Sequence, residues 1–147
     1  MNILTDEYFM GIAIQEAKKA LYRDEVPVGA VVVLDNNIIA RGRNMTEMLN
    51  DVTAHAEIQA ITSAANSIGS KYLTDCIIYT TLEPCLMCAG ALYLSKIKKL
   101  IYSARDKQRG YHSKYNIQLH PNTEVEHGIF EEISEKIITD FFKNKRV

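Results

Sequence analysis

Two short segments of the sequence contain residue types that together bind metal ions. In the first, His55 is followed two residues later by Glu57, and in the second, Cys85 and Cys88 form a C-x-x-C pair directly after a proline. One histidine and two cysteines suit zinc, and three protein ligands leave the fourth tetrahedral position open for water. The two segments therefore predict a catalytic zinc ion, Zn²⁺, held by His55, Cys85 and Cys88.

Glu57 is predicted to transfer protons rather than to bind the metal. Successive residues of a helix are rotated by about 100°, so a glutamate two residues beyond His55 points about 200° away from it. Zinc lowers the pKa of a bound water from about 15.7 to roughly 7, which provides hydroxide at neutral pH. A carboxylate beside that water can accept its proton and return it to a leaving group. The pattern thus favours a hydrolytic reaction in which Glu57 is the catalytic acid and base.

Each of these residues also has a structural interpretation. A single C-x-x-C can be a redox pair, His55 can cap a helix or fill a core, and Glu57 can be a solvated carboxylate in a first helical turn. The combination of H-x-E with P-C-x-x-C favours the metal site over these alternatives. Cys76, the third cysteine, lies in an apolar stretch and is predicted to be a packing residue.

The segments that must position these residues alternate between helices and strands. Apolar residues at helical spacing, β-branched runs and turn residues distinguish the two kinds of element. Their alternation implies a sheet covered by helices, with a parallel part where a helix crosses over between strands. The predicted elements are a helix over 5–23, strands over 28–34 and 38–41, a helix over 54–68, a strand over 75–80, a helix over 84–94, strands over 97–102 and 125–129, and a helix over 130–142.

The composition is that of an ordinary globular protein with a single domain over residues 1–147. Hydrophobic residues make up 47% and charged residues 24%, and the formal net charge of -1 provides no general attraction to nucleic acid, so any basic surface must be local. The longest apolar run, residues 26–34, is too short to cross a bilayer. The first residues lack the basic start and apolar stretch of a secretory signal. We therefore expect a cytoplasmic protein with no membrane partner.

The sequence resembles the bacterial tRNA-specific adenosine deaminase family over nearly its whole length. The pattern of H-x-E followed by P-C-x-x-C is the signature of zinc-dependent nucleobase deaminases, the superfamily that includes cytidine and deoxycytidylate deaminases. The segments 26–30 and 81–91 point more narrowly to the tRNA-editing branch. The matching stretches are 25–31, Asn44, 53–58, 81–91, 104–106, 119–121 and 140–142.

The resemblance implies a fold, a reaction and a set of site residues. The implied fold is α/β, a three-layer α/β/α sandwich with a mixed, central five-stranded sheet, in a single zinc-dependent deaminase domain that forms a homodimer. The implied reaction is hydrolytic deamination of adenosine to inosine at the wobble position of a tRNA anticodon, by zinc-activated hydroxide with Glu57 as the catalytic residue. The residues that the resemblance assigns to substrate binding are Asn44, Ala56, Val28, Asp106, His120 and Phe142.

Residues 107–117 depart from the family pattern. They replace a small glycine-rich loop that borders the substrate entrance in the family, so a second reading stays open, a deaminase of a free nucleobase or nucleoside of the guanine, cytosine or adenosine type. A third and less favoured reading is a catalytically silent zinc- and RNA-binding subunit. That reading requires a fourth zinc ligand, for which the candidates are His112, His120 and His127.

Two further patterns bear on partners. Seven basic residues lie between Lys96 and Tyr115, interleaved with Tyr111 and Tyr115, which suits contacts with RNA phosphates and stacking on bases. A solvated surface loop is the alternative interpretation. The segment 86–94 is apolar on nearly all sides of a helix, which predicts that a second subunit covers it, unless one chain buries the whole helix.

Overall fold

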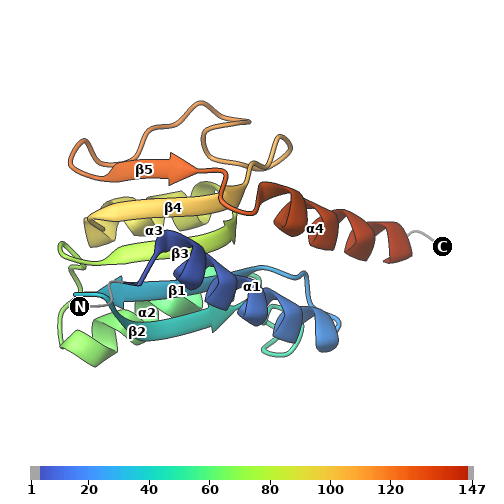
Figure 1. Cartoon of the computed structure of the whole chain (residues 1–147), viewed down its shortest axis with the longest axis horizontal. Helices are drawn as coiled ribbons and strands as arrows, with labels where there is room; N and C mark the ends of the chain where they lie inside the picture. The colour runs from blue at the N-terminus through green and yellow to red at the C-terminus, as the bar shows by residue number, and fades with distance from the viewer. Residues whose placement is uncertain (1–3, 146–147) are drawn as a thin grey trace.

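The computed structural model of the chain describes residues 4–145, which form one mixed sheet with helices on both faces (Figure 1). The strand order is β2-β1-β3-β4-β5, and β1 is antiparallel to both of its neighbours, whereas β3, β4 and β5 run parallel. The strands are β1 (Gly29–Leu34), β2 (Asn37–Arg43), β3 (Ile77–Leu82), β4 (Lys99–Ala104) and β5 (Glu124–His127).

The four helices form the two outer layers. In Figure 1, α1 and α4 lie in front of the sheet and α2 and α3 lie behind it. This arrangement confirms the predicted α/β/α sandwich, and the α3 crossover accounts for the parallel pairing of β3 with β4. The helices are α1 (Asp6–Tyr22), α2 (Ala56–Ile68), α3 (Leu86–Ser95) and α4 (Glu131–Lys145). Within residues 4–145, no helix is both long enough and apolar enough to cross a bilayer.

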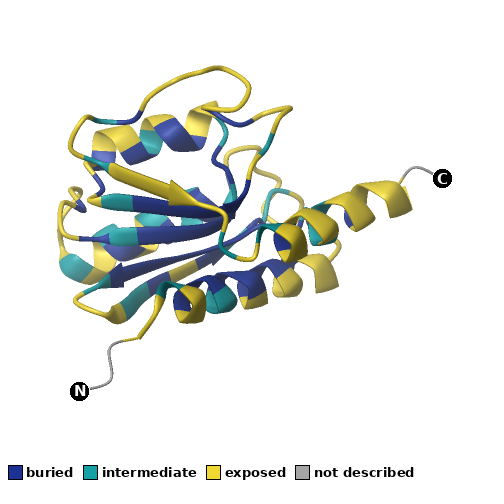
Figure 2. Cartoon of the chain, turned by 45° about the horizontal axis from the view of Figure 1, so that its top comes forward, coloured by how far each residue is buried: buried dark blue, intermediate teal, exposed yellow. Residues whose placement is uncertain are grey.

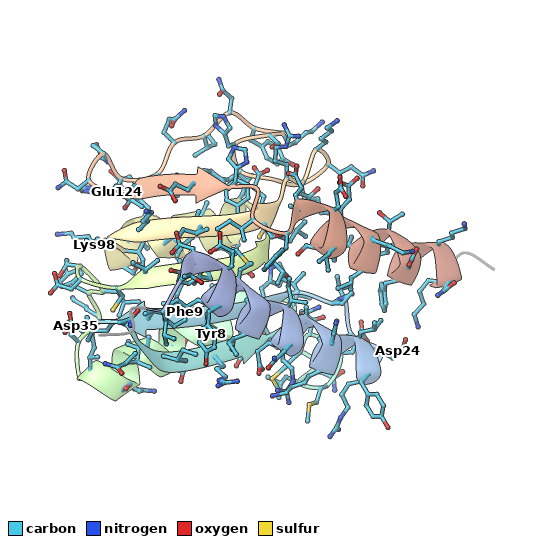
Figure 3. All side chains as sticks on the ribbon, in the orientation of Figure 1. Tyr8, Phe9, Asp24, Asp35, Lys98 and Glu124 are labelled. Carbon is cyan, nitrogen blue, oxygen red and sulfur yellow. The ribbon has the colours of Figure 1, made fainter. Side chains whose placement is uncertain are left out.

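The core lies on both sides of the central strands. Alternate residues of β1 point to opposite faces, so Val31 packs with Phe9 of α1, and Val32 packs with Ala60 of α2. Figure 3 shows Phe9 on α1 over the sheet, and Figure 2 shows buried central strands beside an exposed β5. The prediction of a sheet covered by helices is confirmed for the central strands β1, β3 and β4, and Cys76 is a buried core residue, as predicted.

Several predicted boundaries differ from the structure at the helix starts. The predicted helices over 54–68 and 84–94 begin two residues later, at Ala56 and Leu86. His55 and Cys85 have extended backbones and are the N-caps of α2 and α3. The C-terminal end of α2 is as predicted, because Gly69 takes the left-handed conformation, with a φ of 69°, that ends helices.

Candidate metal centre

The first turns of α2 and α3 meet on one face of the sheet and bring the predicted ligands together. Nδ1 of His55 lies 3.5 Å from Sγ of Cys85 and 3.5 Å from Sγ of Cys88. The ligand atoms of all three residues lie within 4.8 Å of one another. Neither N-cap side chain bonds its own helix, so His55 and Cys85 are both free to bind an ion.

These distances fit a tetrahedral zinc ion. Zinc bonds of about 2.05 Å to nitrogen and about 2.3 Å to sulfur, at the tetrahedral angle, separate the two ligand atoms by about 3.6 Å. The observed separation of 3.5 Å agrees with this value. Among residues 4–145, no fourth histidine, cysteine or carboxylate atom joins the group. The group could therefore hold zinc through His55, Cys85 and Cys88, which would leave one position for water or substrate.

His55, Cys85 and Cys88 contact one another, and these contacts shift the pKa of each side chain. The hydrogen bond from Cys88, followed by that from His55, lowers the pKa of Cys85 to about 4. The same bond to Cys85, together with burial, raises the pKa of Cys88 well above its usual range. The hydrogen bond to Cys85 also raises the pKa of His55, against the opposing effects of burial and of the nearby Arg109 charge. The lowered pKa favours the thiolate form of Cys85, which is the form of cysteine that binds a metal ion.

Glu57 lies in the first turn of α2, next to the ligands but outside their group. Its side chain is beside Cys88, and only 4% of the residue is exposed. Burial, opposed in part by the backbone hydrogen bond, raises the pKa of Glu57 to about 7. Glu57 is therefore a buried carboxyl group outside the ligand group. The predicted rotation of about 200° does not apply, because His55 has an extended backbone and precedes the first helical residue of α2.

Asn44, Val28 and Ala56 lie together on the side of the site formed by the ends of β1 and β2. The Asn44 amide donates to the carbonyl of Val28 at 3.1 Å. Oδ1 of Asn44 accepts from the amide of Thr46 at 3.3 Å, which leaves its Nδ2 group to donate. Ala56 is the first residue of α2, and the first amides of a helix have no partner within it. Asn44 thus caps a loop and still presents a hydrogen-bond donor.

Asp106 and His120 belong to the long connection between β4 and β5. Oδ1 of Asp106 accepts from the amides of Gln108 and Arg109, both at 3.0 Å, and so fixes the turn that carries Arg109. Nδ1 of His120 accepts from the amide of Asn122 at 3.1 Å, and its ring packs on Tyr93 of α3, with centroids 5.4 Å apart.

Phe142 lies in a different layer from the zinc ligands. It is on α4, in front of the sheet, and its ring contacts Phe141 at a centroid distance of 5.3 Å. The structure therefore groups Phe142 with α4 and does not place it against His55, Cys85 or Cys88.

Two buried carboxylates that anchor loops beside the site were not predicted. Glu25 accepts from the amides of Glu47 and Met48, at 3.0 and 2.8 Å, and holds the loop that follows Asn44. Glu83 holds the loop that follows Asp106. Each glutamate lies one or two residues before a proline in an apolar stretch, and that context was the available signal.

The predicted basic segment is divided between two ends of the sheet. Lys98 lies beside Glu124 where β4 and β5 begin (Figure 3), at the end opposite to Cys85. Lys99 pairs with Glu126 at 3.1 Å, and Arg105 pairs with Glu131 at 3.3 Å. Lys107, Arg109 and Lys114 are exposed at the end near the zinc ligands.

One part of the prediction for this segment is wrong. Tyr111 is 3% exposed and packs on Tyr102, so it cannot stack on a base. Tyr115 is exposed, as the prediction requires.

Comparisons with known proteins identify the same region. The sequence matches the cytidine and deoxycytidylate deaminase zinc-binding region over residues 4–104. It is 46% identical over 145 residues to the tRNA-specific adenosine deaminase of Aquifex aeolicus, with 95% of each chain covered. A structure from studies of A-to-I editing by tRNA:A34 deaminases at the wobble position of transfer RNA superposes with a TM-score of 0.83 at 43% identity, covering 88% of this chain and 98% of that one. Guanine deaminase from Bacillus subtilis superposes with a TM-score of 0.67 at 41% identity, covering 69% of this chain and 66% of that one. The matched family region contains all three ligands and Glu57.

Proposed function

This chain belongs to the cytidine and deoxycytidylate deaminase family and is a zinc-dependent deaminase, and we propose that its substrate is adenosine at the wobble position of a tRNA anticodon. The products are inosine in the tRNA and ammonia. The observation that carries the proposal is the three-ligand group with a fourth position open, in a chain that is similar over almost its whole length to a tRNA-specific adenosine deaminase. With a tRNA substrate, the enzyme acts in the cytoplasm.

In this proposal Glu57 moves the protons of the reaction. Zinc, when bound, makes hydroxide available at neutral pH by lowering the pKa of a coordinated water. The Glu57 carboxylate accepts the proton of the attacking water, donates it to the ring nitrogen of the base, and then helps the amine at C6 to leave as ammonia. Burial of Glu57 supports this role, because a buried carboxyl group binds and releases protons near neutral pH.

The side chains around the ligands bind and orient the flipped base. Nδ2 of Asn44 and the amide of Ala56 donate hydrogen bonds to the base, and Val28 packs against it. Asp106 and His120 contact the anticodon loop from the connection between β4 and β5. Phe142 contacts RNA farther from the zinc, since α4 lies in the opposite layer.

A homodimer completes this proposal. Leu86, Met87, Tyr93 and Leu94 of α3 are exposed apolar residues in the single chain, so the alternative that one chain buries the whole helix is wrong. An apolar helix face of this kind is stabilised when a second subunit covers it.

A free-base deaminase is the second candidate function. The similarity to a guanine deaminase structure and the unusual sequence of residues 107–117 both support it. A catalytically silent zinc-binding subunit lacks such support, because within residues 4–145 none of His112, His120 and His127 joins the ligand group.

Three substrates distinguish these functions. The purified zinc protein is incubated with an anticodon stem-loop carrying adenosine at the wobble position, with the same stem-loop carrying guanosine there, and with free guanine. Nucleoside mass spectrometry measures inosine, and a coupled assay measures ammonia. We expect inosine and ammonia from the adenosine stem-loop alone. Ammonia from free guanine with no inosine in RNA would contradict the proposal and establish the second function.

A further inference from the structure

Glu83 is a buried carboxylate directly before the zinc-binding segment, and it accepts four hydrogen bonds from one loop. The residue is 2% exposed. Oε1 accepts from the amide of Asp106 at 3.0 Å and from Oγ of Ser113 at 2.5 Å. Oε2 accepts from the amides of His112 and Ser113, at 3.0 and 2.8 Å. The loop over residues 106–113 is therefore closed around a single side chain.

The backbone next to Glu83 holds the same loop. The amide of Tyr111 donates to the carbonyl of Pro84 at 2.9 Å, and Pro84 is followed by the ligand Cys85. A Cβ atom on Gly110 would lie 2.3 Å from Oε2 of Glu83, so only glycine lets the loop approach this closely. These contacts tie the loop to the segment that carries the zinc ligands.

The loop brings charged groups to the side of the metal centre. Asp106 caps the turn that presents Arg109, and the charge of Arg109 acts on His55. The positions of the Asp106 and Arg109 side chains thus depend on the hydrogen bonds that Glu83 accepts from this loop.

We propose that Glu83 is a positioning residue that fixes the loop over residues 106–113 against the zinc-binding segment and so sets the affinity for the RNA substrate. This inference rests on the proposed function for the identity of the substrate. It predicts that Glu83 acts on substrate binding and not on zinc binding or proton transfer.

The chemistry of the anchor explains why a carboxylate is required. Four donors need two oxygen acceptors, and an ionised carboxylate provides both. Burial alone would raise the pKa of Glu83, but hydrogen bonds from Ser113, Asp106 and His112 lower it below the usual value. Glutamine has the same shape, but its NH₂ group would face two donors.

Steady-state kinetics with the adenosine stem-loop test the proposal, with rates normalised to bound zinc. In Glu83→Gln, KM should rise by about tenfold or more, because each lost bond is to a charged acceptor, while kcat stays within about twofold. Ser113→Ala removes one bond at an exposed residue and should raise KM by a smaller factor, and Ser113→Thr, which keeps the hydroxyl, should restore it. Glu124→Gln on β5, whose carboxylate is exposed and pairs with Lys99, is the matched control and should leave KM unchanged.

Hydrogen exchange provides a measurement that does not depend on activity. The amides of Asp106, His112 and Ser113 should exchange about tenfold faster or more in Glu83→Gln, while those of β3 and β4 stay protected. If the wild-type protein deaminates no RNA, the proposed function fails, and the KM comparison is repeated with the base that it does deaminate. An unchanged KM for the accepted substrate in Glu83→Gln and Ser113→Ala, or a loss of kcat per zinc without a change in KM, overturns the inference.

Discussion

Nδ1 of His55 lies 3.5 Å from Sγ of Cys85, although 30 positions separate the two residues in the sequence. Each is the N-cap of a different helix, and each keeps its side chain out of the usual capping bond. The candidate metal centre is thus a junction between α2 and α3, and His55 and Cys85 can be replaced without changing the interior of either helix.

Removal of a zinc ligand should abolish zinc binding. We expect elemental analysis to find one zinc ion per chain in the wild type and none in Cys85→Ala, because two remaining ligands do not hold the ion tightly. Cys76→Ala is the matched control, since Cys76 is a buried core cysteine outside the site. It should retain zinc with some loss of thermal stability. Full zinc occupancy in Cys85→Ala would contradict the assignment.

Removal of the buried carboxylate should stop turnover and spare the fold. Glu57→Gln should bind zinc normally and melt close to the wild-type temperature, because Glu57 is not a ligand. Its kcat should fall by at least ~10²–10⁴-fold, the usual contribution of a general acid and base. Glu132→Gln, an exposed first-turn carboxylate on α4, should behave as wild type. A well-folded Glu57→Gln enzyme with normal turnover would refute the proton-transfer role.

Substitution with alanine should lower the free energy of unfolding at Gly29 and raise it at Gly11. A Cβ on Gly29 would lie 2.0 Å from the carbonyl oxygen of Ala13 and 2.5 Å from the nitrogen of Ala17, so Gly29→Ala must separate β1 from α1. The free energy of unfolding should fall by about 1–3 kcal/mol. Gly11 lies in α1 with nothing within 4 Å of its Cβ position, so Gly11→Ala should raise that free energy by about 0.5–1 kcal/mol. Urea unfolding measures both, and equal effects would contradict this packing.

The exposed face of α3 should mediate dimerisation. Leu94 is 74% exposed in the single chain, so Leu94→Glu places a charge in the proposed interface without disturbing the core. Sedimentation velocity at micromolar concentration should show a dimer for the wild type and a monomer for this variant. Tyr22→Glu, at a 90% exposed position on α1, should remain dimeric. A monomeric wild-type protein would contradict the prediction.

The two ends of the basic segment should differ in RNA binding. Replacement of Lys107, Arg109 and Lys114 with alanine should weaken stem-loop binding and flatten the slope of log affinity against log salt by about 0.7–0.9 per lost phosphate contact. Replacement of Lys96 and Lys98, at the other end of β4, should change neither quantity. Binding titrations at several salt concentrations measure both. Equal effects from the two sets would indicate nonspecific attraction.

The sequence alone determined the features that depend on local chemistry. The choice of candidate metal ligands follows from their residue types and from the C-x-x-C spacing, which needs only one helical turn. The end of α2 follows from Gly69, because the left-handed conformation there is a property of one residue. The order of helices and strands follows from apolar periodicity, which local backbone geometry imposes.

Only the tertiary structure decided features that depend on contacts between distant segments. The partners of Glu83 lie 23 to 30 positions away, so nothing near Glu83 in the sequence reveals that it anchors a loop. The split of the basic segment depends on β4, because an extended strand carries Lys98 and Lys107 to opposite ends of the sheet. The sequence places Tyr111 in a polar loop, where an exposed side chain is expected. Its ring is nevertheless buried, because the hydrogen bonds to Glu83 and Pro84 hold this loop against Tyr102. Burial of this kind is decided by how elements pack, and packing is not encoded in any single segment.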